Sequence, residues 1–394
     1  MKEGWTYKKL GEVCYKITDG SHNPPKGIEH SDNVMLSSQN VQNGFLDMSA
    51  VRYLSDADFE IENKRTNASK GDVLLTIVGT IGRTCVLKGN EGNITFQRSV
   101  AILKPKEEIM SRYLMFFLMS CNSKLNSTAQ GAAQKGIYLK QLGNITLHYP
   151  SIDEQQRIVE RLDSAFENID KLKANAEKQL SEARILFQKS LAKAMEPKEG
   201  WEEKTLGEIA VDMYRGAGIK RDQVTEEGIP CVRYGEIYTT YNVGFNECVS
   251  HTKIEYLKSP KYFEHGDLLF AITGESVEDI GKTIAYLGKE KCLLGGDIIC
   301  MKHKQNPKYL AYALSTPDAI KQKGFGKTKL KVVHTNAPAL KAIKIPLPPL
   351  PVQQRIVERL DSLSENVRKY EEIQRQIISE CDALKQALLR KVFE

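Results

Sequence analysis

The chain has 394 residues, of which 41% are hydrophobic and 27% charged, and its formal net charge is +6. This is an ordinary composition for a globular protein, and the length suffices for two or more domains. No run approaches the roughly eighteen apolar residues that a membrane-spanning helix needs, which excludes such a helix. The weak positive charge is compatible with a polyanionic partner without identifying one.

The eight cysteines are scattered singly along the chain. None forms a Cys-x-x-Cys pair, and no histidine stands at zinc-finger spacing from two of them, so we expect no zinc site. The first residues contain no apolar signal core. We therefore expect a cytoplasmic protein with free thiols.

The first 150 residues mix short apolar runs with Gly, Asn and Asp turns. Residues 73–78 and 99–103 are typical of buried strands, and residues 113–120 predict a helix. These elements predict an α+β domain over residues 1–150.

Residues 151–196 predict a long helix, with Pro150 before it and Pro197 after it. Apolar residues recur at alternating intervals of three and four, with one stutter, as on a helix that packs along a partner helix. The residues expected in this seam are Ile158, Leu162, Ile169, Leu172 and Leu180.

The second half of the chain repeats the first. Residues 198–201 repeat the Lys-Glu-Gly-Trp of residues 2–5, and residues 353–362 repeat residues 155–164 letter for letter. A second α+β domain is therefore expected over residues 197–347, with strands near 268–272 and 298–301 and a helix near 309–315. A second long helix follows at residues 348–394. Its expected seam residues are Ile356, Leu360, Val367, Tyr370 and Leu384.

The two long helices predict an antiparallel coiled coil that relates the two similar domains by pseudo-twofold symmetry. At about 1.5 Å per residue, each helix extends roughly 60 Å, which spans one to two turns of DNA. The helical segments agree closely between the halves, whereas the domains have diverged outside framework positions. Such a pattern suits recognition of two different half-sites held at a set spacing. The alternatives are a duplication without functional meaning and helices that pack only on their own domains.

Two short motifs suggest chemistry that their context does not support. Residues 23–26, Asn-Pro-Pro-Lys, are similar to the Asn-Pro-Pro-aromatic motif of base-flipping DNA methyltransferases, but lysine replaces the aromatic residue and no cofactor-binding glycine motif accompanies it. Residues 281–283, Gly-Lys-Thr, lack the preceding glycine at the spacing of a phosphate-binding loop. No nucleophile elbow, His-Glu-x-x-His pair or nuclease carboxylate cluster is evident. We expect no catalytic residues, no metal and no cofactor in this chain.

Three motifs occur in the same order in both halves. They are Gly-Trp…Leu-Gly-Glu (Trp5 to Glu12, Trp201 to Glu208), Gly-Asp (Gly71-Asp72, Gly266-Asp267) and the helix start Pro-x-hydrophobic-x-x-Gln-x-x-Ile-Val (Pro150 to Val159, Pro348 to Val357). With this ordered set the chain resembles, over essentially its full length, the specificity subunits of type I restriction-modification systems. One departure is Val352-Gln353 where the family usually has Glu-Gln.

The resemblance implies a non-catalytic subunit with two target recognition domains, each contacting half of a bipartite site in double-stranded DNA. It also implies that the helices set the spacer and dock two methyltransferase subunits, and that restriction/translocase subunits join for cleavage. S-adenosylmethionine, ATP and Mg would belong to those partners. No membrane partner is implied.

Residues that contact DNA are expected among polar side chains in loops that differ between the halves, because Lys and Arg suit phosphates whereas Arg, Asn and Gln suit base edges. In the first domain the candidates are Ser37, Ser38, Gln39, Asn40, Arg83, Arg98, Gln134 and Lys135. In the second they are Arg233, Tyr234, Lys282, Lys327, Lys329 and Lys331. Two rival interpretations remain, an enzyme fused to its own recognition domains and a coiled-coil adaptor that does not contact DNA.

Overall fold

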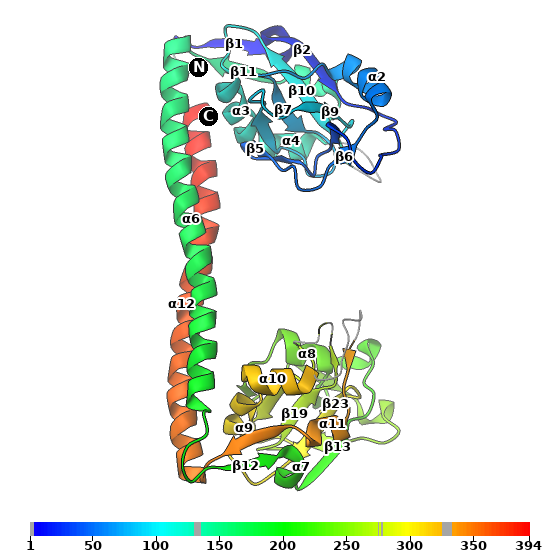
Figure 1. Ribbon diagram of the computed structural model, residues 1–394, viewed down its shortest axis with the longest axis vertical. Helices are drawn as coiled ribbons and strands as arrows, with labels where there is room; N and C mark the ends of the chain where they lie inside the picture. Colours follow the sequence, from blue (N-terminus) through cyan, green and yellow to red (C-terminus); the bar gives the residue numbers. More distant parts are fainter. Residues whose placement is uncertain (1–3, 130–134, 275, 277–278, 325–332) are drawn as a thin grey trace. The chain divides into compact units, whose positions relative to one another are not determined.

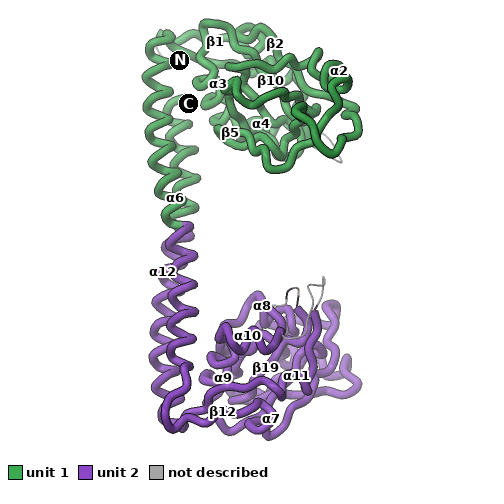
Figure 2. The backbone as a smooth tube through the Cα atoms, in the orientation of Figure 1, with its two compact units in different colours: residues 1–176, 376–394 green, residues 177–375 purple. Residues whose placement is uncertain are grey.

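The computed structural model describes residues 4–129, 135–274, 276, 279–324 and 333–394. It contains two compact units, residues 1–176 with 376–394 and residues 177–375 (Figure 2). Each unit combines one mixed domain with parts of both long helices. Among the described residues, no helix is both long and apolar enough to span a membrane.

The domain of the first unit contains, in chain order (Figure 1), β1 (Thr6–Lys9), α1 (Leu10–Val13), β2 (Cys14–Asp19), β3 (Asn33–Leu36), β4 (Val41–Gln42), β5 (Phe45–Leu46), β6 (Arg52–Tyr53), α2 (Asp56–Thr66), β7 (Val73–Thr76), β8 (Thr84–Val86), β9 (Asn93–Phe96), β10 (Val100–Pro105), α3 (Ser111–Ser120), α4 (Asn122–Thr128), α5 (Leu139–Gly143) and β11 (Thr146–Tyr149). The first long helix, α6, spans Ile152–Ala194.

The domain of the second unit contains β12 (Glu202–Thr205), α7 (Leu206–Ile209), β13 (Asp212–Arg215), η1 (Arg221–Gln223), β14 (Val224–Thr225), β15 (Ile229–Val232), α8 (Tyr234–Thr239), β16 (Gly244–Phe245), β17 (Ser250–Thr252), η2 (Ile254–Tyr256), β18 (Tyr262–Phe263), β19 (Leu268–Ala271), β20 (Thr273–Gly274), β21 (Thr283–Tyr286), β22 (Cys292–Leu294), β23 (Ile298–Lys302), α9 (Pro307–Ala313), α10 (Pro317–Gly324), β24 (Val333–His334), α11 (Ala337–Lys341) and β25 (Lys344–Leu347). The second long helix, α12, spans Leu350–Phe393.

The two domains share one topology. The main sheet has the order β2-β10-β7-β8 in the first unit and β13-β23-β19-β21-β16 in the second. A parallel pair, β3 with β9 and β15 with β22, belongs to a second sheet in each domain, with the orders β6-β3-β9 and β14-β17-β15-β22-β18. An antiparallel ladder, β1 with β11 and β12 with β25, closes each domain next to the long helices. The sequence repeat is therefore also a repeat of the fold.

The central strands are uninterrupted apolar runs because both faces of the main sheet are covered. Val73 and Leu75 point into a core formed with α3 and the long helices, whereas Leu74 points into a core formed with β3 and β9. Residues 268–271 alternate in the same way between two cores of the second unit. Successive residues of a strand face opposite sides, so a sheet buried on both faces needs apolar residues at every position. The expected α+β class is confirmed.

The Gly-Asp motif forms the turn that enters the central strand. Gly71 and Gly266 have φ values of 91° and 88°, a conformation that favours glycine. The aspartate that follows is buried in both units, and its carboxylate accepts a backbone N–H, from Ser69 in one unit and Glu264 in the other, at 2.9 Å. The motif thus stabilises the domain framework.

The repeated glutamine at each helix start joins the helix to its domain. Gln155 is fully buried; its Nε2 donates to the carbonyls of Glu108 and Pro150 at 3.0 Å each, and its Oε1 accepts from the N–H of Met110 at 2.9 Å. Gln353 is buried in the same way and accepts from the N–H of Asn306 at 3.0 Å. These contacts account for the retention of this glutamine in both halves.

Within each unit the two long helices pair in antiparallel orientation. In the first unit Asp170 pairs with Lys385, and Lys173 donates to Asp382 at 2.8 Å. Residue numbers therefore increase along α6 in the direction in which they decrease along α12. In the second unit Arg184 donates to Glu371 at 2.8 Å. The predicted antiparallel pairing is confirmed.

The structure places the expected seam residues at different depths. Leu162, Ile169 and Leu360 are buried, and Ile158, Leu180, Ile356 and Val367 are half-buried. Burial was wrongly expected for Leu172 and Leu384, which are 50% and 48% exposed. Tyr370 is 39% exposed, but its hydroxyl donates to Gln179 Oε1 on the other long helix at 2.9 Å. A helix of 3.6 residues per turn drifts away from a strict three-four pattern. As a result Phe166, Ala176, Cys381 and Leu389 are buried instead.

Candidate nucleic-acid interface

In the first unit, three loops meet at one end of the two sheets. The turn after β3 contacts the turn between β9 and β10, because the N–H of Ser38 donates to Ser99 Oγ at 3.0 Å. The segment after β2 joins them through a bridge between Ser21 and Gln97. We call residues 19–22, 37–40 and 97–99 loop cluster 1. It brings together the predicted residues Ser37, Ser38, Gln39 and Arg98.

The second unit builds the same arrangement from residues 215–223, 233–239 and 295–297, which we call loop cluster 2. The bridge between Ala217 and Gly295 matches the one between Ser21 and Gln97. Both clusters need a glycine directly after the strand that enters them, Gly20 after β2 and Gly216 after β13. A Cβ on Gly216 would lie 2.1 Å from the carbonyl oxygen of Gly295, and one on Gly20 would lie 1.9 Å from that of Phe96.

The basic side chains of loop cluster 1 surround a buried carboxylate. Asp19 is 7% exposed, and it pairs with the guanidinium of Arg65 and with Nε2 of His22 at 2.8 Å. The Nε of Arg65 also donates to the backbone oxygen of Asp19 at 2.9 Å. Arg98 is exposed nearby. The sequence reasoning missed Arg65, because it reaches the cluster from α2, 46 residues away in sequence.

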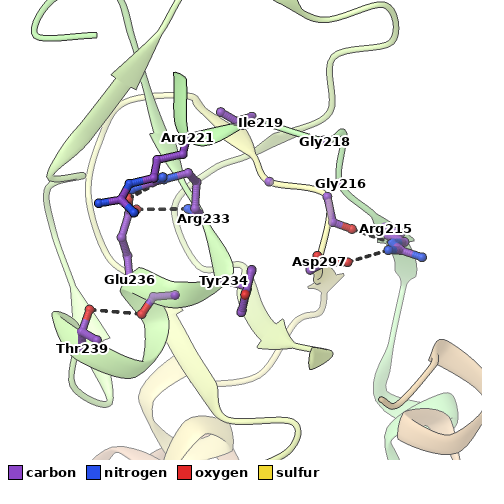
Figure 3. Close-up of a pocket in the computed structure, with 13 residues that line it drawn as sticks. Arg215, Gly216, Gly218, Ile219, Arg221, Arg233, Tyr234, Glu236, Thr239 and Asp297 are labelled. Carbon is purple, nitrogen blue, oxygen red and sulfur yellow. Dashed lines mark hydrogen bonds and ion pairs between the residues drawn. The ribbon is translucent and has the colours of Figure 1, made fainter. Parts of the chain in front are cut away.

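Loop cluster 2 forms an open groove of about 930 Å³ (Figure 3). Arg215, Arg221, Arg233 and Tyr234 line it, and an adjoining groove shares Arg215. The adjoining groove also holds Lys220, Lys258 and Lys261. Among the described residues, two carboxylates line these grooves, Glu236 and Asp297.

Each of the two carboxylates fixes one arginine, as Figure 3 shows. Arg215 donates to Asp297 at 2.6 Å and to the carbonyl of Gly296 at 2.5 Å. Arg233 donates through Nε to Glu236 at 2.9 Å. The remaining cations of the two grooves are exposed, so the combined surface is positive. An open groove with a positively charged lining is suited to a phosphate backbone.

Comparison with known proteins identifies the family. The family model described as the type I restriction modification DNA specificity domain matches residues 2–182 and again residues 198–377. The chain belongs to this family. Each match covers one recognition domain and the following part of a long helix, so the two loop clusters belong to two copies of one specificity domain.

Among relatives, the EcoBI specificity subunit of Escherichia coli is 28% identical over 204 residues, 49% of this chain and 42% of that protein. The chain therefore spans less than half of EcoBI in that alignment. The StySPI specificity subunit of Salmonella potsdam is 22% identical over 100% of this chain and 89% of its own length. A chain solved in a study of complex assembly and conformational transition of the type I R-M system has the same fold, with a TM-score of 0.74, 18% identity and coverage of 100% and 98% of the two chains.

In this specificity protein, two predicted contact residues are used inside the fold. Asn40 is 5% exposed; its Oδ1 accepts from the N–H of Ser37 at 2.9 Å, and its Nδ2 donates to two carbonyls. Lys282 is half-buried and donates to the carbonyls of Tyr238 and Tyr241 at 3.3 and 3.4 Å, and burial lowers its pKa. We therefore assign both side chains to loop structure.

The other predicted residues fall in three places. Arg233 and Tyr234 lie in loop cluster 2. Arg83 lines a separate groove of the first unit beside α3 and the long helices, whereas Lys135 is exposed next to the bridge between Val78 and Gly136. Gln134, Lys327, Lys329 and Lys331 lie outside the described residues.

Of the two motifs that suggested chemistry, residues 23–26 lie in a loop and residues 281–283 lead into β21. The carbonyl of Pro25, in the Asn-Pro-Pro-Lys segment, accepts from Arg52 at 3.0 Å. Next to Lys282, the Gly281 carbonyl accepts from Lys323 at 2.7 Å. Lys323 is buried, and burial lowers its pKa to about 7. Among the described residues, no group of three His, Cys, Asp or Glu side chains is placed to hold a metal ion.

Proposed function

We propose that this chain is the DNA-recognition subunit of a type I restriction-modification complex, and that each loop cluster contacts one half of a bipartite site in double-stranded DNA. The observation that carries the proposal is the pair of matched clusters. Their strands, bridges and glycines correspond, whereas their polar side chains differ. A constant framework with different contact residues is what recognition of two different half-sites requires.

The exposed cations of each cluster are proposed to contact phosphates. These are Lys220 and Arg221 in loop cluster 2, with Lys258 and Lys261 in the adjoining groove. At loop cluster 1 they are Arg98 and Arg65, which reaches the cluster from α2, and both are exposed. Each phosphate contact releases condensed counterions, so such binding weakens as salt increases.

The long helices are proposed to set the distance between half-sites and to dock two methyltransferase subunits. They contain 43 and 44 residues, which correspond to roughly 65 Å of helix each at about 1.5 Å per residue. They also expose large apolar side chains, of which Leu172, Ile185 and Leu186 on α6 are at least half exposed. These side chains are proposed to contribute apolar area to the contact with the methyltransferase subunits.

Catalysis is assigned to the partners. The methyltransferase subunits would supply S-adenosylmethionine and adenine methylation, and restriction/translocase subunits would supply ATP- and Mg-dependent cleavage. We also propose a cytoplasmic location, supported by the eight free cysteines. A methyltransferase assay on the purified chain, alone and with its partner, tests this division. Activity of the chain alone would favour the fused-enzyme alternative.

The salt dependence of DNA binding tests the interface. Replacing Lys220, Arg221 and Lys258 with glutamine is expected to reduce the slope of log K against log salt by up to about 0.9 for each phosphate that the variant no longer neutralises. The control replaces Lys204 and Lys344, which lie on the β12–β25 ladder and outside both grooves. An unchanged slope in the triple variant, or an equal change in the control, would contradict this interface.

The lysines beyond α10 are tested separately. Replacing Lys327, Lys329 and Lys331 together is expected to weaken DNA binding by the assembled complex and to flatten its salt dependence. A salt slope equal to that of the unmodified complex would remove these lysines from the interface. Binding with and without the methyltransferase partner, measured by electrophoretic mobility shift, separates this function from that of an adaptor that does not contact DNA.

A further inference from the structure

Arg233 differs from the other cations of loop cluster 2 in the way it is held. It lies at the end of β15, and its own N–H donates to Glu236 Oε2 at 3.0 Å while its Nε donates to Oε1 at 2.9 Å. Glu236 is 7% exposed, and its Oε1 also accepts from Ser250 Oγ at 2.7 Å. The arginine is therefore fixed by a carboxylate that is itself fixed.

This arrangement leaves the far end of the guanidinium available to a ligand. The Arg233 side chain is 30% exposed and lines the groove, and no described group accepts a hydrogen bond from its two terminal nitrogens. Arg215 is different, because one of its terminal nitrogens already donates to Asp297. The two terminal nitrogens of arginine match O6 and N7 of guanine in the major groove, the commonest specific contact between a side chain and a base.

The first unit keeps the turn but changes the side chain. Ser37 follows β3 as Arg233 follows β15, and its N–H donates to Asn40 Oδ1 at 2.9 Å as that of Arg233 donates to Glu236. The backbone hydrogen bond is thus common to both clusters, whereas the guanidinium is present in one. Different side chains at the same position of the same turn can recognise different bases, and so can distinguish two half-sites.

We propose that Arg233 recognises a guanine in the half-site bound by the second domain, through its two terminal nitrogens, and that Glu236 is a positioning residue for it. This inference rests on the proposed function and deepens it. The paired carboxylate offsets the charge of Arg233, so its main contribution is discrimination between bases. The exposed cations Lys220 and Arg221 contribute affinity without base discrimination.

The test uses the specificity protein assembled with its methyltransferase partner and a site defined by methylation mapping. Each guanine of both half-sites is replaced in turn by 7-deazaguanine, which lacks N7, or by inosine, which retains N7 and O6. One 7-deazaguanine position is expected to weaken binding on the order of tenfold or more. Inosine at that position is expected to leave major-groove recognition intact.

The decisive readout is the loss of this effect in a variant. In Arg233→Ala the 7-deazaguanine penalty is expected to disappear at that one position and to persist elsewhere. Glu236→Gln, which keeps the size of the side chain, is expected to reduce the same penalty. The control Arg221→Ala is expected to weaken binding to all sequences alike and to retain the full penalty.

Two failures are distinguishable. If the unmodified complex neither binds nor methylates a bipartite site, the proposed function fails. If it does so, but no guanine is sensitive to 7-deaza substitution or the penalty persists in Arg233→Ala, only the guanine contact is overturned. A uniform loss of binding in Arg233→Ala with an unchanged penalty would assign this residue to the phosphates.

Discussion

Replacing Gln155 with alanine should destabilise the first unit strongly, because this buried side chain joins α6 to its domain. The side chain makes three hydrogen bonds at 2.9–3.0 Å inside the protein. Each is worth about 1 kcal/mol net, and the variant also leaves a buried N–H and two carbonyls without their partner. We therefore expect the free energy of unfolding of this unit to fall by about 3 kcal/mol.

Urea unfolding followed by tryptophan fluorescence measures this loss in one unit at a time. The chain has two tryptophans, Trp5 in the first unit and Trp201 in the second. In a Trp201→Phe background the signal reports only the unit that contains Gln155. The control is Gln156→Ala, because that neighbour is exposed and its side chain donates to Glu160 on the same helix. Its loss should therefore cost no more than about 0.5 kcal/mol. Equal effects of the two substitutions would refute the reasoning.

Other features of the fold lead to three more expected outcomes. Burial lowers the pKa of Lys323 to about 7, so between about pH 7 and pH 10.5 the unfolded chain binds a proton that the folded protein does not. The free energy of unfolding should therefore rise over this range by up to about 1.4 kcal/mol per pH unit. Urea titrations at several pH values should show a smaller rise for Lys323→Met. Gly216→Ala should lower the melting temperature, because the added Cβ would collide with the carbonyl of Gly295. The control Gly218→Ala should not, because open space surrounds its Cβ. Equal melting temperatures of the two variants would contradict this. Deleting one heptad from each long helix should shorten the preferred spacer between half-sites by about three base pairs. Methylation of DNA sites with varied spacers measures this change. An unchanged spacer would show that the helices do not set the distance between half-sites.

The elements of this fold follow closely from local sequence patterns. The helices expected at residues 151–196 and 348–394 span Ile152–Ala194 and Leu350–Phe393, because apolar periodicity and flanking prolines act over a few residues. The strand expected at 73–78 is β7, Val73–Thr76. Seam positions were less predictable, since the small mismatch between 3.5 and 3.6 residues per turn accumulates along a helix.

The candidate site was only partly predictable, for a physical reason. Polar residue types indicate hydrogen-bonding capacity but not the partner. Asn40 and Lys282 therefore looked like contact residues, although their side chains donate to backbone carbonyls of other residues in the same domain. Conversely, Arg65 reaches Asp19 only through the tertiary fold. The sequence did contain one signal of the proposed DNA-contacting loop, the adjacent Lys220 and Arg221 shortly after Gly216 and Gly218.

The first unit is assembled from two distant stretches of chain, residues 1–176 and 376–394. Phe393 packs against Tyr113 and Phe117 at centroid distances of 5.2 and 5.8 Å, and Leu389 is fully buried in the same core. During synthesis the part of this core that contacts Phe393 and Leu389 therefore stays uncovered until the ribosome has made the whole of the second unit. The domain translated first is completed last, and in the interval its open core is exposed to aggregation and to chaperones.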